Sequence, residues 1–338
     1  MQIDGRDISH SQAPYIVAEI SCNHAGSLER AHQLIVAARK AGADAVKFQA
    51  YTPDTITIDH NGPDFIIKDG LWKGRSLYEL YRVAYTPFEW FPYLFLTAQT
   101  ERITLFASVF DKSSIDMLER LDCPAYKIAS MEIVDIPLIE YASSTKKPII
   151  LSTGMATDKE IEAAAWACAG WLHRNPPAVL HCVSGYPANA ANYDLRRMGN
   201  FSDIYGISDH TNGCVVPVAA TALGANIIEK HFMMGDVRTE DYEFSLDPNA
   251  FSIMANSVRN TWAAMQKPRD NEEEASRQLR RSLYVVEDIK QGESFTEYNV
   301  RSIRPAYGLA PRELPWLLTK RAAEDLKRGT ALRKEHAR

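Results

Sequence analysis

Two histidines in this sequence follow short apolar runs at matching positions, and together they could hold a metal ion. His210 comes after the run at 204–208, and His231 comes after the run at 226–230. If these runs are neighbouring parallel strands, about 4.8 Å apart, both imidazoles can reach one divalent cation. A lone histidine at such a position more often caps a strand, but the pair favours metal binding. Two nitrogen donors with carboxylates nearby predict Mn²⁺, Mg²⁺ or Co²⁺ rather than a closed structural zinc site.

Two lysines and several hydroxyl groups predict that an anion binds beside these histidines. Lys47 and Lys127 lie in apolar runs, and a buried lysine is costly unless an anionic group pairs with it. Hydroxyl side chains end or follow other runs, at Ser108, Ser130, Ser152, Thr153, Ser184 and Ser208. Any one of them could instead satisfy loop backbone. Taken with both lysines, the set favours a phosphate ester or a carboxylate as the ligand.

Four carboxylates near the same run ends are candidates for acid–base catalysis. They are Glu19, Glu132, Glu229 and Asp241. Each could alternatively form an ion pair with a lysine, and for Glu132 and Glu229 the two interpretations carry equal weight. Gln49 lies two residues after Lys47, so both side chains face the same side of their strand.

The elements that must position these side chains are eight short apolar runs with helical stretches between them. The runs occupy 15–20, 45–49, 103–107, 125–128, 148–152, 178–182, 204–208 and 226–230. Residues 28–40 are amphipathic and end before Gly42, and residues 158–171 open with acidic residues and continue through alanines. This alternation predicts an α/β fold, a parallel (β/α)8 TIM barrel whose active site lies at the carboxyl ends of the strands. An open doubly wound sheet is the alternative, but no GxGxxG motif follows the first run.

Two parts of the chain exceed a minimal barrel. Residues 49–103 predict an extended loop over the barrel mouth, with a turn at 61–63 and an aromatic, helix-like stretch at 77–96. Residues 268–280 read as a charged linker, and residues 281–338 as a small basic domain with short strands at 283–286 and 300–303. We therefore expect a catalytic barrel at 1–267 and a small domain at 281–338. So small a domain forms only a marginal core and is expected to pack on its own barrel or on a second subunit.

Composition argues against several classes of function. The formal net charge of −5 disfavours nucleic acid as the main partner. The weakly polar stretch at 215–228 is too short to span a bilayer, and the polar start of the chain does not resemble a signal peptide. Five cysteines without C-x-x-C spacing predict reduced thiols in a cytoplasmic protein.

Motifs along nearly the whole chain resemble those of the sialic acid synthase (nonulosonate synthase) family, in the same order. They are EISCNH at 19–24, VKFQ at 46–49, YKIAS at 126–130, LSTGM at 151–155, SDHT at 208–211 and EKHF at 229–232. The tail, with RSL at 281–283 and IRP at 303–305, is similar to the antifreeze-like (SAF) domain of that family. Finer motifs, YTPDTIT at 51–57, LYELY at 77–81 and EIVDIP at 132–137, are most similar to the pseudaminic acid synthase branch.

The resemblance implies a role for each matched residue. His210 and His231 would hold the divalent metal. Phosphoenolpyruvate would be bound by Lys47, Ser108, Lys127, Ser130, Ser152, Ser184 and Ser208. The sugar would contact Gln49, Glu132, Tyr186 and Asp241, and Glu19 would position the attacking water with Asp241. Arg304, on the small domain, would reach the sugar site of the partner barrel in a domain-swapped homodimer.

The implied reaction is a transferase reaction between phosphoenolpyruvate and an amino-sugar aldose, the open-chain form of a 2,4-diacetamido-2,4,6-trideoxyhexose. Carbon–carbon bond formation is followed by loss of phosphate through C–O cleavage. The sequence departs from the family pattern at three places. Val109 and Ser184 stand where proline and, in sialic-acid-making relatives, asparagine are usual. Residues 238–241 replace an expected glycine-proline turn, which leaves Asp236, Glu240 and Glu243 as alternatives to Asp241.

Three other interpretations stay open from the sequence. An N-acetylneuraminate or legionaminate synthase would keep the chemistry and change the aldose. A class II aldolase or another barrel metalloenzyme would act without phosphoenolpyruvate and would need a third histidine ligand, for which His181 is the nearby candidate. A sugar-binding module without catalysis is disfavoured because every matched ionisable group at the barrel rim is retained.

Overall fold

The structure, a computed structural model, describes residues 1–169, 176–267 and 272–338. Contacts divide the chain into two compact units, Met1–Gln266 and Lys267–Arg338. The end of the predicted helix at 158–171 and the start of the predicted linker at 268–280 lie outside the described residues. The boundaries at 267 and 281 therefore stay predictions.

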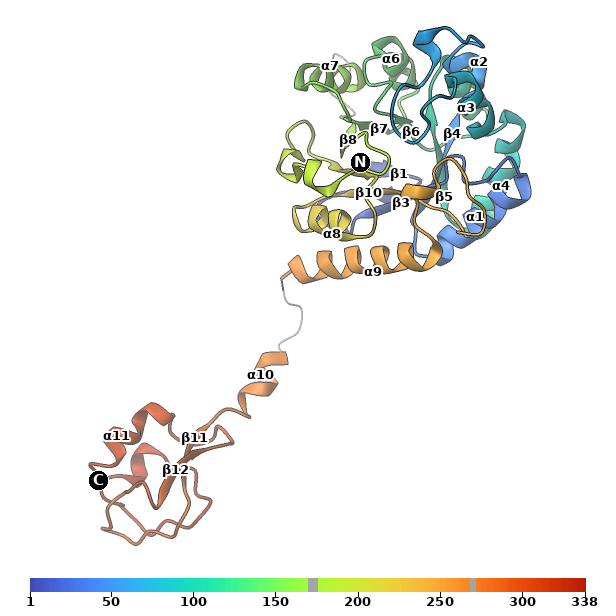
Figure 1. The fold of residues 1–338 in the computed structure, drawn as a ribbon. Coiled ribbons are helices and arrows are strands. Elements are labelled where there is room, and N and C mark those ends of the chain that lie inside the picture. Colours follow the sequence, from blue (N-terminus) through green and yellow to red (C-terminus); the bar gives the residue numbers. More distant parts are fainter. Residues whose placement is uncertain (170–175, 268–271) are drawn as a thin grey trace. The chain divides into compact units, whose positions relative to one another are not determined.

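The first unit is a closed barrel of eight parallel strands in the order β10-β3-β4-β5-β6-β7-β8-β9 (Figure 1). The strands are β3 (Tyr15–Glu19), β4 (Ala45–Ala50), β5 (Thr104–Val109), β6 (Tyr126–Ile128), β7 (Ile149–Ser152), β8 (Ala178–Cys182), β9 (Tyr205–Asp209) and β10 (Ile227–His231). Every predicted run becomes one strand, with ends shifted by no more than about two residues. The barrel prediction is confirmed.

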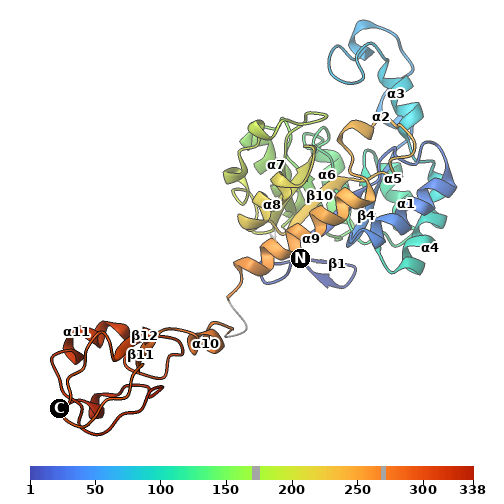
Figure 2. The same cartoon turned by 60° about the horizontal axis from the view of Figure 1, so that its bottom comes forward.

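Most of the following helices cover the outside of the barrel, whereas the two at 53–56 and 77–84 lie at one end of it (Figures 1 and 2). The helices are α1 (Leu28–Lys40), α2 (Pro53–Ile56), α3 (Leu77–Ala84), α4 (Phe91–Glu101), α5 (Lys112–Glu119), α6 (Ile136–Ser144), α7 (Asp158–Ala169), α8 (Val215–Ala222) and α9 (Pro248–Met265). α1 has the predicted bounds. Its first turn is capped by the Ser27 hydroxyl, which accepts a hydrogen bond from the backbone N–H of Arg30, and Gly42 follows its end at a φ of 96°.

Two connections differ from the expectation of simple helices between strands. The stretch at 77–96 is not one helix but parts of α3 and α4. Tyr85 is already extended, and Pro87 offers no backbone N–H with which to continue α3. Residues 183–204, between β8 and β9, form only the short 3₁₀ turns Ala190–Asn192 and Leu195–Arg197. Asparagine and proline in this segment favour turns over helix.

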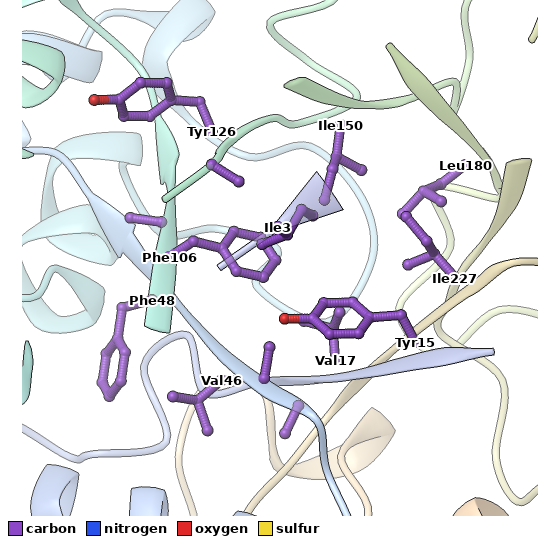
Figure 3. Close-up of a cluster of buried hydrophobic side chains, with 14 of the residues drawn as sticks. Ile3, Tyr15, Val17, Val46, Phe48, Phe106, Tyr126, Ile150, Leu180 and Ile227 are labelled. Carbon is purple, nitrogen blue, oxygen red and sulfur yellow. The ribbon is translucent and has the colours of Figure 1, made fainter. Parts of the chain in front are cut away.

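An amino-terminal hairpin that the sequence did not predict closes one end of the barrel. β1 (Gln2–Ile3) pairs with β2 (Arg6–Asp7), and Ile3 is fully buried. Figure 3 shows Ile3 beside Phe106, among the apolar side chains that fill the barrel, which include Tyr15, Val17, Ile150, Leu180 and Ile227. This apolar filling leaves the opposite end, at the strand carboxyl ends, for polar residues.

The second unit has an apolar core of its own. It contains α10 (Glu272–Arg277), β11 (Ser282–Val285), β12 (Val300–Ile303) and α11 (Leu314–Leu317). β11 and β12 pair antiparallel, within one residue of the strands predicted for this region. The core residues are Leu283, Val285, Ile289, Phe295, Val300, Leu317, Ala322, Leu326 and Leu332.

Two broader expectations concern the whole chain. Within the described ranges, no helix is both long enough and apolar enough to cross a bilayer. All five cysteines are free thiols, as expected for reduced cysteines.

Candidate active site

A cavity of about 650 Å³ opens at the carboxyl ends of the barrel strands, and all eight strands contribute to its wall. It brings together every predicted site residue except Glu132, Arg304 and Thr153, of which Thr153 lines a separate cavity. The predicted residues that line it are Glu19, Lys47, Gln49, Ser108, Lys127, Ser130, Ser152, Ser184, Tyr186, Ser208, His210, Glu229, His231 and Asp241. They meet because alternate residues of each strand face the barrel interior.

The two lysines share one carboxylate at the deep end of this cavity. Glu229 Oε1 lies 3.2 Å from Lys47 Nζ and 3.2 Å from Lys127 Nζ, and it also accepts a hydrogen bond from Ser208 at 2.9 Å. Burial by itself would raise the pKa of Glu229, but Lys127 and Lys47 outweigh it and hold that pKa well below its usual range. Glu229 is therefore an ionised partner of both lysines, so the ion-pair interpretation has geometric support and its catalytic role stays a prediction.

Glu19 has the opposite electrostatic character, although it lies next to the same lysine. Its Oε2 is 3.1 Å from Lys47 Nζ, and its Oε1 accepts a hydrogen bond from Gln49 at 3.1 Å. Burial raises the pKa of Glu19 despite Lys47. A carboxyl that holds its proton more readily than usual is suited to proton transfer with a water molecule.

Several hydroxyl groups face the cavity with unused hydrogen-bonding capacity. Within the described residues, the buried Oγ atoms of Ser152 and Ser184 have no hydrogen-bond partner. Ser130 Oγ accepts a hydrogen bond from the Gly154 backbone N–H at 3.1 Å. A Cβ on Gly154 would come within 2.1 Å of Ser184 Oγ and 2.8 Å of Ser130 Oγ. Glycine at this position therefore keeps open a pocket lined by hydroxyls, of the kind that an anion fills.

The two predicted metal ligands lie side by side. His210 and His231 end neighbouring strands, and their ring centroids are 5.3 Å apart. His210 Nδ1 is 3.1 Å from the carbonyl oxygen of Val183, which can only accept, so Nδ1 carries the proton and Nε2 keeps its lone pair. Among the described residues, no group of three or more His, Cys, Asp or Glu side chains is placed to hold a metal. The pair fits an open site in which water or substrate completes the coordination.

A buried ion pair on the outer face of the same two strands fixes the position of the histidines. Asp209 and Lys230 precede His210 and His231, and Asp209 Oδ2 lies 2.6 Å from Lys230 Nζ with both side chains fully buried. Asp209 also accepts hydrogen bonds from the backbone and hydroxyl of Thr211. Next to it, a Cβ on Gly206 would lie 1.9 Å from the Ile227 carbonyl oxygen, so only glycine permits this approach of β9 to β10.

Asp241 is the carboxylate of its loop that reaches the histidines. Its Oδ2 lies 3.3 Å from His231 Nδ1, and although burial opposes ionisation, His231 outweighs it and lowers the pKa of Asp241. Of the alternatives, Asp236 pairs with Arg30 outside the cavity and Glu243 pairs with Arg238 on the surface. Glu240 lines the cavity but pairs with Arg75 at 2.7 Å.

Glu132, Arg304 and two further histidines lie outside the cavity wall. Glu132 is mostly buried just after β6, and burial raises its pKa to about 7. Arg304 is exposed on the second unit, where it lines a shallow hollow with Arg280 and Arg281. His181 faces a separate cavity of about 480 Å³, so it is not a third ligand for the histidine pair. His24 is buried against Trp90 and 3.2 Å from the Thr86 hydroxyl.

The sequence did not reveal the aromatic side of the cavity. Phe244 lies 4.8 Å from the ring of His231 and 5.2 Å from that of Tyr186, and Trp72 lies 5.6 Å from Tyr186, measured between ring centroids. Both Phe244 and Trp72 come from irregular loops, where no hydrophobic period marks a side chain as buried. The available signal for Trp72 was a large aromatic residue in a loop, between the glycines Gly70 and Gly74.

Comparison with known proteins identifies the relatives of this arrangement. The sequence model of the NeuB family matches residues 34–270, and that of the SAF domain matches residues 280–338. A pseudaminic acid synthase of Campylobacter jejuni (strain 81-176) is 45% identical over 334 residues, which are 96% of this chain and 96% of the relative. A pseudaminic acid synthase of Helicobacter pylori is 41% identical over 95% of this chain and 97% of its own.

More distant relatives include enzymes named for other sugar acids. The N,N'-diacetyllegionaminic acid synthase of Legionella pneumophila is 32% identical over 96% of this chain and 95% of its own. The crystal structure of an N-acetylneuraminic acid synthetase from Leptospira borgpetersenii, in complex with citrate, superimposes with a TM-score of 0.71 at 28% identity. It covers 82% of this chain and 94% of that chain.

Proposed function

The chain belongs to the NeuB family, and from that premise we propose that it is a pseudaminic acid synthase, an enzyme that condenses phosphoenolpyruvate with a 2,4-diacetamido-2,4,6-trideoxyhexose. The 45% identity to a pseudaminic acid synthase, against 32% to a legionaminic acid synthase, supports this acceptor. The observation that carries the proposal is the convergence of two buried lysines, free serine hydroxyls and a pair of imidazoles in one cavity.

Phosphoenolpyruvate carries a phosphate and a carboxylate, and the deep end of the cavity offers matching groups. Lys47 and Lys127 supply the cationic groups. Although burial opposes it, Glu19 and Glu229 raise the pKa of Lys47. Burial lowers the pKa of Lys127, which an anionic ligand would raise again. Ser108, Ser130, Ser152, Ser184 and Ser208 supply hydrogen bonds to the remaining oxygens. The cavity thus holds the anion beside the histidine pair.

The proposed reaction has three successive steps, which are carbon–carbon bond formation, addition of water and C–O cleavage. Carbon 3 of phosphoenolpyruvate attacks the aldehyde carbon of the acceptor, which Gln49, Tyr186 and Asp241 hold in place, and the aldehyde oxygen takes up a proton to become a hydroxyl group. Water then adds to the cationic carbon 2 while Glu19 and Asp241 position it, and a neighbouring carboxylate accepts its proton. The resulting tetrahedral intermediate breaks its C–O bond, so phosphate leaves with the former enol oxygen and carbon 2 becomes a ketone. Lys47 and Lys127 stabilise the phosphate throughout.

His210 and His231 are the residues that would hold a divalent cation, and such an ion would supply a Lewis acid for the aldehyde oxygen. We further propose a homodimer in which Arg304 completes the sugar site of the partner subunit. The free cysteines support a cytoplasmic enzyme.

Two measurements test the proposal. Phosphate release is followed with phosphoenolpyruvate, Mn²⁺ and a panel of aldoses, and turnover is expected with the diacetamido-trideoxyhexose. Turnover with N-acetylmannosamine alone would defeat this assignment, and activity without phosphoenolpyruvate would point to an aldolase. Phosphoenolpyruvate labelled with ¹⁸O at the enol oxygen should give labelled inorganic phosphate, because the C–O bond is the one that breaks.

A further inference from the structure

The loop between α2 and α3 forms part of the cavity wall, although it belongs to no barrel strand. An isolated bridge joins Ile66 to Ser76, and backbone hydrogen bonds join Ile67 to Arg75 and Gly74 to Ile67, so residues 66–76 fold back on themselves. We call residues 66–76 the rim hairpin. In Figure 2 the loop between α2 and α3 rises at one end of the barrel unit, with the amino-terminal hairpin at the other.

The rim hairpin is held to the loop that carries Asp241 by two contacts with one residue. Trp72 Nε1 donates to the backbone carbonyl oxygen of Glu240 at 3.3 Å, and Arg75 lies 2.7 Å from the Glu240 carboxylate. The ion pair is only partly exposed, with a quarter to a third of each side chain accessible. Because Glu240 directly precedes Asp241, the hairpin and the carboxylate near His231 are fixed to the same loop.

The rim hairpin gives the outer part of the cavity a different chemistry from its deep end. The side chains that it and α3 contribute are mainly apolar, with Ile67, Leu71, Trp72, Leu77, Leu80 and Tyr81 in the wall. The indole ring of Trp72 packs against the rings of Tyr186 and Phe244, and these contacts hold it in the cavity wall. An acceptor with methyl and acetyl groups would bury them here, whereas hydroxyl groups would lose water with few partners in exchange.

We infer that the rim hairpin determines acceptor specificity, with Trp72 as the main apolar contact for the acetamido or deoxy-methyl groups of the aldose and Arg75 as the positioning residue that holds the hairpin to Glu240. This inference rests on the proposed function. The inference assigns recognition of the sugar substituents to residues 66–76, a segment that none of the matched motifs includes.

The test compares variants on two acceptors at saturating phosphoenolpyruvate. Trp72→Ala should lower kcat/KM for the diacetamido-trideoxyhexose by about 10- to 50-fold, the range that apolar pockets achieve, and change kcat/KM for N-acetylmannosamine less than threefold or raise it. KM for phosphoenolpyruvate should stay within about twofold, because Trp72 contacts Glu240, Tyr186 and Phe244 rather than the lysines. Lys73→Ala is the matched control, since Lys73 is in the same hairpin, is mostly exposed and does not line the cavity.

Arg75→Met separates positioning from folding, because it leaves Trp72 in place. This variant should raise KM for the acceptor more than it lowers kcat, and amide hydrogen exchange across 66–76 should accelerate while the barrel strands stay protected. Equal losses on both acceptors in Trp72→Ala, or unchanged exchange in Arg75→Met, would overturn the inference. The proposed function fails on a different result, namely release of phosphate by the wild-type protein with no aldose present. The variants test only the inference, so the two failures can be told apart.

Discussion

At the scale of single residues, three glutamates that lie in barrel strands or follow them differ in the direction of their pKa shifts. Glu229 lies between two ammonium groups and stays ionised, whereas Glu19 and Glu132 are held by burial toward their protonated forms. Neighbouring charges and burial therefore distinguish carboxylates that the sequence alone could not rank.

The histidine pair gives the most direct test at this scale. His210→Ala or His231→Ala should reduce phosphate release by at least about 10³-fold, because the remaining imidazole alone is a poor metal ligand. Neither ring belongs to the apolar filling of the barrel, so the midpoint of thermal unfolding should change by only a few degrees. His181→Ala is the control, since His181 faces the other cavity. Calorimetric titration with Mn²⁺ should detect binding in the control and none in the two ligand variants.

Glu132 predicts a pH dependence of stability. Its pKa of about 7 in the folded protein lies above the ordinary value of 4.5, so the contribution of its buried protonated form is complete below pH 4.5 and is lost as the pH rises through 7. Wild-type protein should lose roughly 1–3 kcal/mol more unfolding free energy between pH 5 and pH 8 than Glu132→Gln does. Urea unfolding at both pH values measures the difference, and parallel losses in the two proteins would show that Glu132 ionises normally.

Sequence reasoning found fourteen residues of the cavity wall, and most of them lie on a barrel strand or within two residues of its end. A side chain at the carboxyl end of a barrel strand, such as Lys47 or Ser208, has its position set by the strand alternation. Trp72 and Phe244 could not be found in this way, since the contacts that bury them are made between loops far apart in the chain. The sequence could not distinguish Asp241 from Asp236, Glu240 and Glu243 for the same reason. In the structure those three form ion pairs with arginines, and Asp241 alone of the four lies against His231.

At the scale of elements, all eight strands followed from their apolar runs, and the errors occurred where proline or local turns interrupt a pattern. The division of 77–96 at Pro87 and the absence of an α-helix in 183–204 are examples. The amino-terminal hairpin was missed because two-residue strands give no period to detect. The hairpin packs through Ile3 against the apolar side chains inside the barrel, and this contact forms only when the barrel has folded.

The buried ion pair between β9 and β10 should contribute more than its exposed counterparts. Lys230→Met leaves the Asp209 carboxylate buried without its cation and should destabilise the protein by about 3–5 kcal/mol. Arg196→Met removes a contact with Asp194 that solvent screens, because 86% of the arginine side chain is exposed, and should change the unfolding free energy far less than Lys230→Met does. Urea denaturation of both variants makes the comparison. Equal costs would mean that the Asp209–Lys230 pair does not fix these strand ends.

At the scale of the whole molecule, the proposed role of Arg304 across a dimer predicts complementation. Arg304→Ala and Lys127→Ala should each be nearly inactive alone. If they are unfolded and refolded together, mixed dimers pair an intact barrel with an intact Arg304, and random assortment should restore about a quarter of wild-type turnover. Each variant refolded alone is the control. A mixture no more active than its components would place Arg304 outside the partner site.

The single carboxylate shared by Lys47 and Lys127 has a consequence for which ions the resting enzyme attracts. With Glu229 already 3.2 Å from both ammonium groups, the deep end carries its own counter-ion. A monovalent ion such as chloride would gain less there than at a pair of free lysines, because Glu229 already neutralises one of the two ammonium charges. A molecule with two separate anionic groups can engage each ammonium from its own side, so the cavity discriminates against the abundant simple salts of its surroundings before any sugar arrives.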